Sequence, residues 1–245
     1  MRKTQVVLLH GFGETSDIWD MLIPKLLPNC NYIRFDYSKI TFCTSIEEYA
    51  DWLHSKIEEN NITRFVLIGH SMGGYIAMAY AEKYGNYLSG LCLFHSTSYE
   101  DSDAKKDIRA KTVKFIEKHG AAEFIEDFLP NMYNEDFKRR NKVYIEKQLT
   151  DNKQLPAEAL IVATKAMAQR PDRRKVLKSL DIPCLMIIGG KDKFVNYESS
   201  IEQISLLKNP FVLILHHIAH AGMVESPDSC AAIINEFLEV CETGY

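Results

Sequence analysis

The sequence lacks the long apolar segments that would place it in or across a membrane. No apolar run approaches the roughly 20 residues that a membrane-spanning helix needs. The N-terminus, Met1-Arg2-Lys3, is followed by only four consecutive apolar residues, Val6 to Leu9, which is too few for the apolar core of a signal peptide. We therefore expect a cytoplasmic protein that makes no membrane contact.

The sequence also lacks an excess of positive charge and any paired-cysteine motif. Lys plus Arg number 29 against 33 Asp plus Glu, a net charge of −4, so there is no basic footprint for nucleic acid. None of the six cysteines forms a CxxC pair, and Cys92 and Cys184 lie inside apolar runs, where cysteine is a packing residue. We expect a reduced protein without a metal or an organic cofactor.

Short apolar runs alternate along the chain with amphipathic stretches. Each run is almost continuously apolar, which is typical of a parallel strand buried on both faces. Six such strands are predicted, at residues 6–10, 32–35, 65–69, 91–95, 184–188 and 211–215.

The stretches between most of these strands carry helix signals. Ser45 with Glu48 forms a capping box ahead of an apolar helix face. Residues 71–84 predict a second helix, and Ser226-Pro227 begins a last one. The order predicts an α/β protein, with a doubly wound and mostly parallel sheet that has helices on both faces.

One segment interrupts the alternation with helical signals alone. It runs from about Ser98 to Ser179, and Gly120, Pro130 and Pro156 divide it. We interpret it as an all-helical lid rather than a second domain, because the chain returns to the sheet at Cys184. The predicted divisions are 1–97 for the first part of the core, 98–180 for the lid and 181–245 for the rest of the core.

The strongest motif is Gly69-His70-Ser71-Met72-Gly73, which fits G-x-S-x-G between a predicted strand and a predicted helix. The turn is sharp and leaves no room for side chains at the two glycines, so Ser71 is lifted out at the edge of the sheet. The pattern predicts Ser71 as a catalytic nucleophile.

A serine nucleophile needs a base, and the base needs a carboxylate to orient it. His220 follows the last strand and Asp192 follows the strand before it, in the chain order Ser, acid, His. The rival bases are His216 and His217. The rival acids are Glu100 and Asp101, which follow the preceding strand.

Two main-chain N–H groups should stabilise the oxyanion of the transition state. Met72, directly after the nucleophile, supplies one. The glycine-rich loop His10-Gly11-Phe12-Gly13 after the first strand supplies the other, through Phe12.

Together these residues resemble the α/β-hydrolase superfamily of small cytoplasmic ester hydrolases. The resemblance covers the chain apart from the lid. It rests on His10-Gly11-Phe12-Gly13, Gly69-His70-Ser71-Met72-Gly73-Gly74, Gly189-Gly190-Lys191-Asp192, and His220 with Glu225 and Pro227. It implies the α/β-hydrolase fold, with a helical cap that covers the site and sets substrate choice.

The chain departs from this family in three places. Only nine residues precede His10, so the usual N-terminal hairpin is expected to be missing, which leaves about six strands. Asp36-Tyr37-Ser38-Lys39 replaces a common glycine-bearing turn, and Ala219 stands where glycine is common. Serine at the elbow argues against the dehalogenases and epoxide hydrolases of this fold, which use aspartate there.

The predicted function is a serine hydrolase that cleaves a small to medium acyl substrate, most simply a carboxylic ester, through an acyl-enzyme. Thioesterase, lactonase and carbon–carbon bond hydrolase stay open, as does a ligand receptor of the same fold with little turnover. Phe94, Tyr99 and Phe128 are predicted to line an apolar pocket, whereas the acidic stretch Glu123, Glu126 and Asp127 is interpreted as a solvated helix face. The only partner predicted is the small-molecule substrate, and the protein is expected to be a monomer or a homodimer.

Overall fold

The core of the molecule is a single six-stranded sheet. The computed structural model describes residues 3–243. The strand order is β2-β1-β3-β4-β5-β6, and every neighbouring pair is parallel. The strands are β1 (Gln5–Leu9), β2 (Asn31–Phe35), β3 (Phe65–His70), β4 (Leu88–Phe94), β5 (Cys184–Gly189) and β6 (Pro210–Leu215). The sheet is therefore entirely parallel rather than mostly so.

The central strands are apolar on both faces because helices cover both faces. Every residue of β3, β4 and β5 is buried. The bounds of the predicted strands agree with the observed ones to within about three residues. The largest difference is that β4 begins at Leu88 instead of Leu91. Within residues 3–243, β1 is the first element, and the sheet has the six strands that the sequence predicts.

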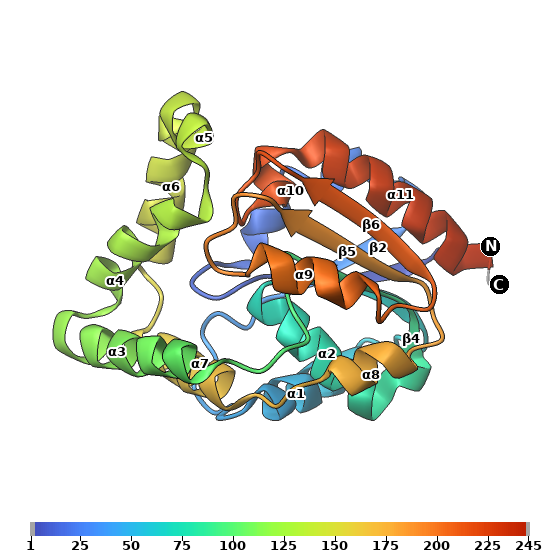
Figure 1. Cartoon of the computed structure of the whole chain (residues 1–245), viewed down its shortest axis with the longest axis horizontal. Helices are drawn as coiled ribbons and strands as arrows, with labels where there is room; N and C mark the ends of the chain where they lie inside the picture. The colour runs from blue at the N-terminus through green and yellow to red at the C-terminus, as the bar shows by residue number, and fades with distance from the viewer. Residues whose placement is uncertain (1–2, 244–245) are drawn as a thin grey trace.

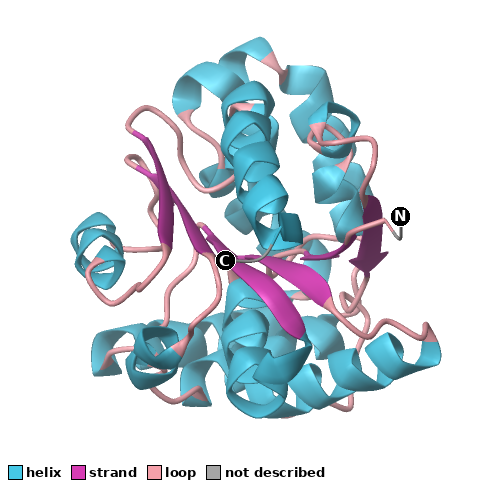
Figure 2. Cartoon of the chain, turned by 90° about the vertical axis from the view of Figure 1, so that its right-hand side faces the viewer, coloured by secondary structure: helices cyan, strands magenta, loops and turns pink. Residues whose placement is uncertain are grey.

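Helices pack on both sides of this sheet (Figures 1 and 2). One side carries α1 (Ile46–Glu59), α2 (Met72–Tyr84) and α8 (Arg174–Ser179), and α11 (Pro227–Thr243) covers the other. The side chain of Ser45 accepts a hydrogen bond from the Glu48 N–H at 3.2 Å, so the predicted cap begins α1. The last helix begins at Pro227, as its sequence predicts.

The segment between β4 and β5 is helical, and its larger part lies away from the sheet (Figure 1). We call α3 to α7 the inserted helices. They are α3 (Asp103–His119), α4 (Ala121–Phe128), α5 (Glu135–Arg140), α6 (Lys142–Asn152) and α7 (Ala157–Gln169), and the 3-10 turn η4 (Leu129–Met132) joins α4 to α5. The remaining short helices are η1 (Ser16–Trp19), η2 (Ile23–Lys25), η3 (Gly85–Tyr87), α9 (Tyr197–Ile204) and α10 (Gly222–Glu225).

A buried ion cluster anchors the two ends of the inserted helices. The Asp101 carboxylate, which is fully buried, lies 2.8 Å from Arg170 Nη1 and 3.1 Å from Arg109 Nε. Burial alone would raise the pKa of Asp101, but the two guanidinium groups hold it below its usual range. Arg170 also stacks on the Tyr75 ring of α2, with 3.9 Å between the guanidinium carbon and the ring centroid. The segment is thus fixed to the helix that begins at the elbow.

None of the helices within residues 3–243 is both long and apolar enough to cross a bilayer. All six cysteines lie in this range, each is buried, and each is a free thiol.

Candidate active site

The turn from β3 into α2 has the strained geometry that the glycine motif predicts. Ser71 has φ 50° and ψ −114°, a left-handed conformation that few residues other than glycine adopt. A Cβ at Gly69 would fall on the main chain of Gly73, so the turn requires glycine there. The Ser71 N–H donates to the Phe94 carbonyl at 3.0 Å, and the Ser96 hydroxyl donates to the Ser71 carbonyl at 2.7 Å. The end of β4 therefore holds the strained residue in place.

Asp192 and His220 lie side by side although 28 residues separate them in the sequence. His220 Nδ1 donates to Asp192 Oδ2 at 2.7 Å, and both side chains are buried. The other carboxylate oxygen, Oδ1, accepts the main-chain N–H groups of Phe194 at 2.7 Å and Val195 at 3.0 Å. Burial alone would raise the pKa of Asp192, but the His220 ring and these hydrogen bonds hold it below its ordinary value. An ionised Asp192 leaves the proton of His220 on Nδ1 and frees Nε2 to act as a base.

The elbow and the histidine loop meet through the residue that precedes Ser71. His70 Nε2 donates to the His220 carbonyl at 2.8 Å, and the two rings are 4.8 Å apart. Among the hydrogen bonds of the described residues, none joins the Ser71 hydroxyl to His220. Contacts of this kind commonly tighten only in the complex with substrate.

His70 also forms a buried ion pair beneath the glycine-rich loop. Its Nδ1 lies 2.9 Å from Glu14 Oε1, and neither side chain reaches solvent. Burial works against a charged His70, but the Glu14 carboxylate and the bond to the His220 carbonyl raise its pKa above the ordinary value. A Cβ at Gly11 would collide with this pair, which explains why glycine stands there.

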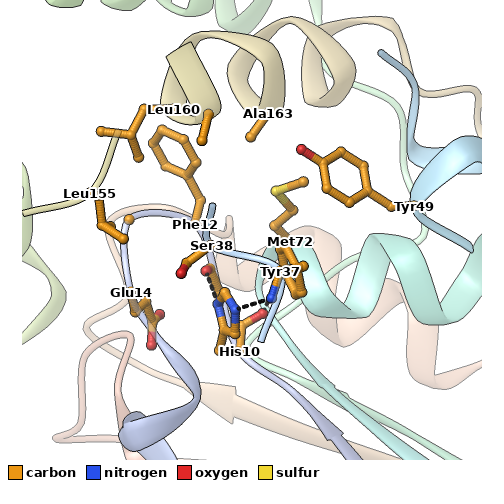
Figure 3. Close-up of a pocket in the computed structure, with 13 residues that line it drawn as sticks. His10, Phe12, Glu14, Tyr37, Ser38, Tyr49, Met72, Leu155, Leu160 and Ala163 are labelled. Atoms are coloured by element: carbon orange, nitrogen blue, oxygen red, sulfur yellow. Dashed lines mark hydrogen bonds between the residues drawn. The ribbon is translucent and has the colours of Figure 1, made fainter. Parts of the chain in front are cut away.

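Contacts between His10 and Tyr37 hold the loop after β1. His10 stacks on Tyr37, with 4.0 Å between ring centroids, and its Nε2 accepts the Tyr37 N–H at 3.1 Å. The Tyr37 hydroxyl donates to the His10 carbonyl. Figure 3 shows the Phe12 ring pointing toward Leu160 of α7, with the Glu14 carboxyl on the opposite side of the loop. Tyr37, in the turn that departs from the common glycine-bearing type, therefore holds His10 at the start of the loop that carries Phe12.

A cavity lies between this loop and α7 (Figure 3). It measures about 10 Å³, room for about one water molecule. Residues of this loop line the cavity together with four residues of the segment between β4 and β5, which are Leu155, Ala159, Leu160 and Ala163.

Aromatic rings connect Phe12 to His220. Phe128 of α4 lies 5.5 Å from the Phe12 ring and 5.1 Å from the Phe194 ring, and Phe194 lies 4.9 Å from the His220 ring. Gly13 has φ 73°, and a Cβ there would press against Phe128 at 3.0 Å. The inserted helices thus sit directly on the loop that carries Phe12.

The structure separates the three predicted pocket residues. Phe128 contacts Phe12 and Phe194, as described above. Phe94 is completely buried in β4 and packs against Trp19 at 5.6 Å, as a residue of the protein core. The Tyr99 hydroxyl donates to Glu202 at 3.1 Å, and Arg174 lies over its ring at 4.4 Å. Phe94 and Tyr99 are held by packing within the fold, whereas the Phe128 ring lies against the rings of Phe12 and Phe194.

The rival residues are occupied elsewhere. His216 and His217 are exposed in the turn after β6, whereas His220 is buried. Asp101 belongs to the arginine cluster, and Glu100 lies 3.7 Å from Lys106 at the surface. The acidic face of α4 is exposed, with Glu126 paired to Lys153 at 2.8 Å.

Glu225 ties the histidine loop to the inserted helices. Its carboxylate accepts the N–H of Ala219 at 3.0 Å and the N–H of Asn134 at 2.9 Å, as well as the Asn134 side-chain amide. The His220 N–H donates to the Met132 carbonyl at 2.9 Å. The position of His220 is therefore set partly by residues of the inserted segment.

Three buried residues next to the site escaped the sequence analysis: Glu14, His70 and His95. His70 lies inside the G-x-S-x-G motif but at a position that the motif leaves open. Glu14 and His95 directly follow a glycine-rich loop and a strand, yet their partners lie far away in the sequence. Within the described residues no group of three or more His, Cys, Asp or Glu side chains could hold a metal ion.

The sequence is similar to a family model and to several characterised proteins. Residues 4–227 match the family model described as the alpha/beta hydrolase fold. The chain is 24% identical to a pimeloyl-[acyl-carrier protein] methyl ester esterase of Neisseria meningitidis serogroup A, covering 96% of this chain and 77% of the relative. It is 23% identical to lipase 1 of Psychrobacter immobilis, covering 97% and 77%.

Solved structures show the same architecture. A thermophilic esterase from Thermogutta terrifontis superposes with a TM-score of 0.90 at 26% identity, covering 96% of this chain and 89% of that one. An enol-lactonase from Burkholderia xenovorans LB400 also reaches 0.90, at 17% identity and covering 98% and 93%. The second likeness concerns the fold alone.

Proposed function

Since the chain belongs to the alpha/beta-hydrolase fold family, we propose that it is a serine hydrolase that cleaves carboxylic esters of small to medium acyl chains. Ser71 is the nucleophile, His220 the general base and Asp192 the acid that orients it. The N–H groups of Phe12 and Met72 form the oxyanion hole.

The contact between His220 Nδ1 and Asp192 Oδ2, 2.7 Å long, is the observation that carries this proposal. It supplies a base in the tautomer that serine activation needs. The strained φ of Ser71 supports the nucleophile, and the hydrogen bond from His70 to the His220 carbonyl joins the two loops. Met72 begins α2, where the first N–H groups have no acceptor within the helix.

The proposed reaction proceeds in two halves. The Ser71 oxygen attacks the ester carbonyl carbon while His220 Nε2 takes the hydroxyl proton, and His220 then gives that proton to the departing alkoxide. Water attacks the acyl-enzyme in the second half, again with His220 as base, and releases the carboxylic acid and Ser71. The positive end of α2 and the two N–H donors stabilise the negative charge that develops on the carbonyl oxygen.

The substrate class follows from the walls of the site and from the relatives. The rings of Phe12, Phe128 and Phe194 favour an apolar acyl group. The relatives named above include a methyl ester esterase, a lipase and an esterase, which supports an ester in preference to a thioester or a carbon–carbon bond.

A panel of substrates tests this function. Wild type and Ser71→Ala are assayed against p-nitrophenyl acetate and butyrate, matched thioesters and lactones. We expect ester hydrolysis by wild type and none above background by Ser71→Ala, with equal circular dichroism for both. Equal rates for the two proteins would refute the role of Ser71. Fluorophosphonate labelling without turnover of any substrate would instead indicate a ligand receptor.

A further inference from the structure

A third buried histidine adjoins the Asp192–His220 pair, and the proposed reaction does not use it. His95 directly follows β4, and its side chain is fully buried. Its φ is 46°, a left-handed conformation that is strained for a non-glycine residue and persists only where its surroundings impose it. The titratable groups that face it are Asp192, His220 and His70.

Hydrogen bonding fixes the tautomer of His95. The Gly222 N–H donates to His95 Nε2 at 3.1 Å, so this nitrogen carries no proton. Burial, together with the neighbouring histidines, lowers the pKa of His95 to about 3 against the opposing effect of Asp192. The ring is therefore neutral at pH 7, and its single N–H is on Nδ1.

That Nδ1–H faces the catalytic carboxylate. It lies 3.7 Å from Asp192 Oδ2, the oxygen that also accepts from His220 Nδ1. Within the described residues, His95 Nδ1 is buried and has no hydrogen-bond partner. The contact is longer than a hydrogen bond, so the N–H acts on Asp192 as the positive end of a dipole.

The protein leaves space for an imidazole at this point. A Cβ on Gly222 would lie 2.6 Å from His95 Nε2, and one on Gly189 would lie 2.9 Å from Cε1. Gly189 ends the strand before Asp192, and Gly222 begins the short helix after His220. His95 thus touches both loops that bring the acid and the base together.

We propose that His95 is a positioning residue for the triad, which steadies Asp192 with its Nδ1–H and holds the His220 loop through its Nε2. This inference deepens the proposed function and rests on it. It assigns the two nitrogens different tasks, and two amide replacements can separate these tasks.

Asparagine and glutamine each reproduce one half of the imidazole. In His95→Asn the side-chain amide lies near the place of Nδ1 and can donate toward Asp192, and asparagine tolerates a positive φ. In His95→Gln the longer side chain brings its carbonyl near the place of Nε2, where it can accept from Gly222. His95→Leu removes both groups.

The experiment measures kcat/KM for p-nitrophenyl butyrate from pH 5 to pH 9, together with the melting temperature of each variant. We expect His95→Leu to lose about tenfold or more in kcat/KM, since small displacements of catalytic groups are costly. The acid limb of its pH profile, where kcat/KM falls at low pH, should move to higher pH. The reason is that an Asp192 without the nearby N–H stabilises the His220 imidazolium more strongly. His95→Asn should restore the limb, whereas His95→Gln should restore the melting temperature and leave the limb shifted.

A folded His95→Leu variant with the wild-type kcat/KM and acid limb would overturn the inference. If His95→Leu does not fold, the two amide variants decide, and identical pH profiles for His95→Asn and His95→Gln would overturn it. The rate of fluorophosphonate labelling across the same pH range gives the comparison without turnover. Full activity in Ser71→Ala is the separate result that would end the proposed function itself.

Discussion

At the scale of single residues, the site depends on which nitrogen of each histidine carries a proton. His220 donates to Asp192 from Nδ1, and His70 donates to the His220 carbonyl from Nε2. One carboxylate, Glu14, faces His70, and a different one, Asp192, faces His220. The two histidines therefore have separate acidic partners.

Asp192→Asn tests the orienting acid. An amide can present its N–H to His220 Nδ1, which would stabilise the wrong tautomer and leave no base for Ser71. We expect turnover to fall by about 10⁴-fold, the size of this effect in the serine-protease triad. Steady-state kinetics on a p-nitrophenyl ester measures it. A variant with nearly full activity would mean that the acid lies elsewhere.

The His70–Glu14 pair predicts a pH dependence of stability. The pKa of His70 is raised in the folded protein, so folding favours its proton. The resulting contribution to the free energy of unfolding is complete below about pH 6.5, the ordinary pKa of histidine. It is lost as the pH rises through the pKa of His70 in the folded protein. Urea unfolding between pH 6 and 9 should show the decline in wild type and a weaker one in His70→Gln.

Glu14→Gln serves as the matched control, because it removes the carboxylate and leaves the histidine in place. It should weaken the decline as well. An undiminished decline in both variants would show that another group is responsible.

At the scale of elements, the turn between β3 and α2 combines a positive φ at Ser71 with a glycine that has no room for a side chain. Gly69→Ala would place a methyl group on the main chain of Gly73. The clash is with main-chain atoms, so a change of side-chain rotamer cannot relieve it. We expect a large fall in melting temperature and loss of esterase activity, because both strand and helix must shift.

Gly85→Ala is the control at the other end of α2. Gly85 has φ −58°, and a Cβ there meets nothing within 4 Å, so alanine should be neutral or stabilise the protein by about 0.4–1 kcal/mol. Thermal unfolding followed by circular dichroism compares the two variants. Equal melting temperatures would contradict the steric account of the elbow.

Helix α4 supplies the wall of the proposed acyl site through Phe128. Phe128→Ala removes a ring that bridges Phe12 and Phe194, and so should make room for longer chains. We expect the ratio of kcat/KM for p-nitrophenyl octanoate to that for acetate to rise about tenfold. Phe115→Ala, which removes a ring stacked on His119 of α3, should leave the ratio unchanged.

The sequence predicted the elements whose causes are local. The elbow, the Ser45 cap and the six strands depend on neighbours in the chain, and the structure contains all of them. What it could not predict depends on partners far away in the sequence. In the sequence His95 is the last residue of a predicted strand. Its hydrogen bond to Gly222 could not be predicted, because 127 positions separate the two residues. A pocket role for Phe94 stays a prediction, because apolar side chains of the core and of a site are alike in sequence.

At the scale of the whole molecule, the inserted helices and the catalytic loops form one packed unit. The arginine cluster at Asp101 fixes the base of the inserted segment, and the bonds from Asn134 to Glu225 and from His220 to Met132 fix its far side. Gly13 allows α4 to rest on the loop of Phe12. The position of His220 is therefore set by these contacts, and in the proposed enzyme the same contacts would limit substrate size.

In the proposed reaction one hydroxyl group, on Ser71, forms the covalent intermediate. Its most direct test is mass spectrometry of the protein after reaction with a fluorophosphonate, followed by peptide mapping. We expect a single adduct on the peptide that contains Ser71, absent from Ser71→Ala and much slower to form in His220→Ala. An adduct on a different residue, or an unmodified Ser71 in a protein that still hydrolyses esters, would contradict it.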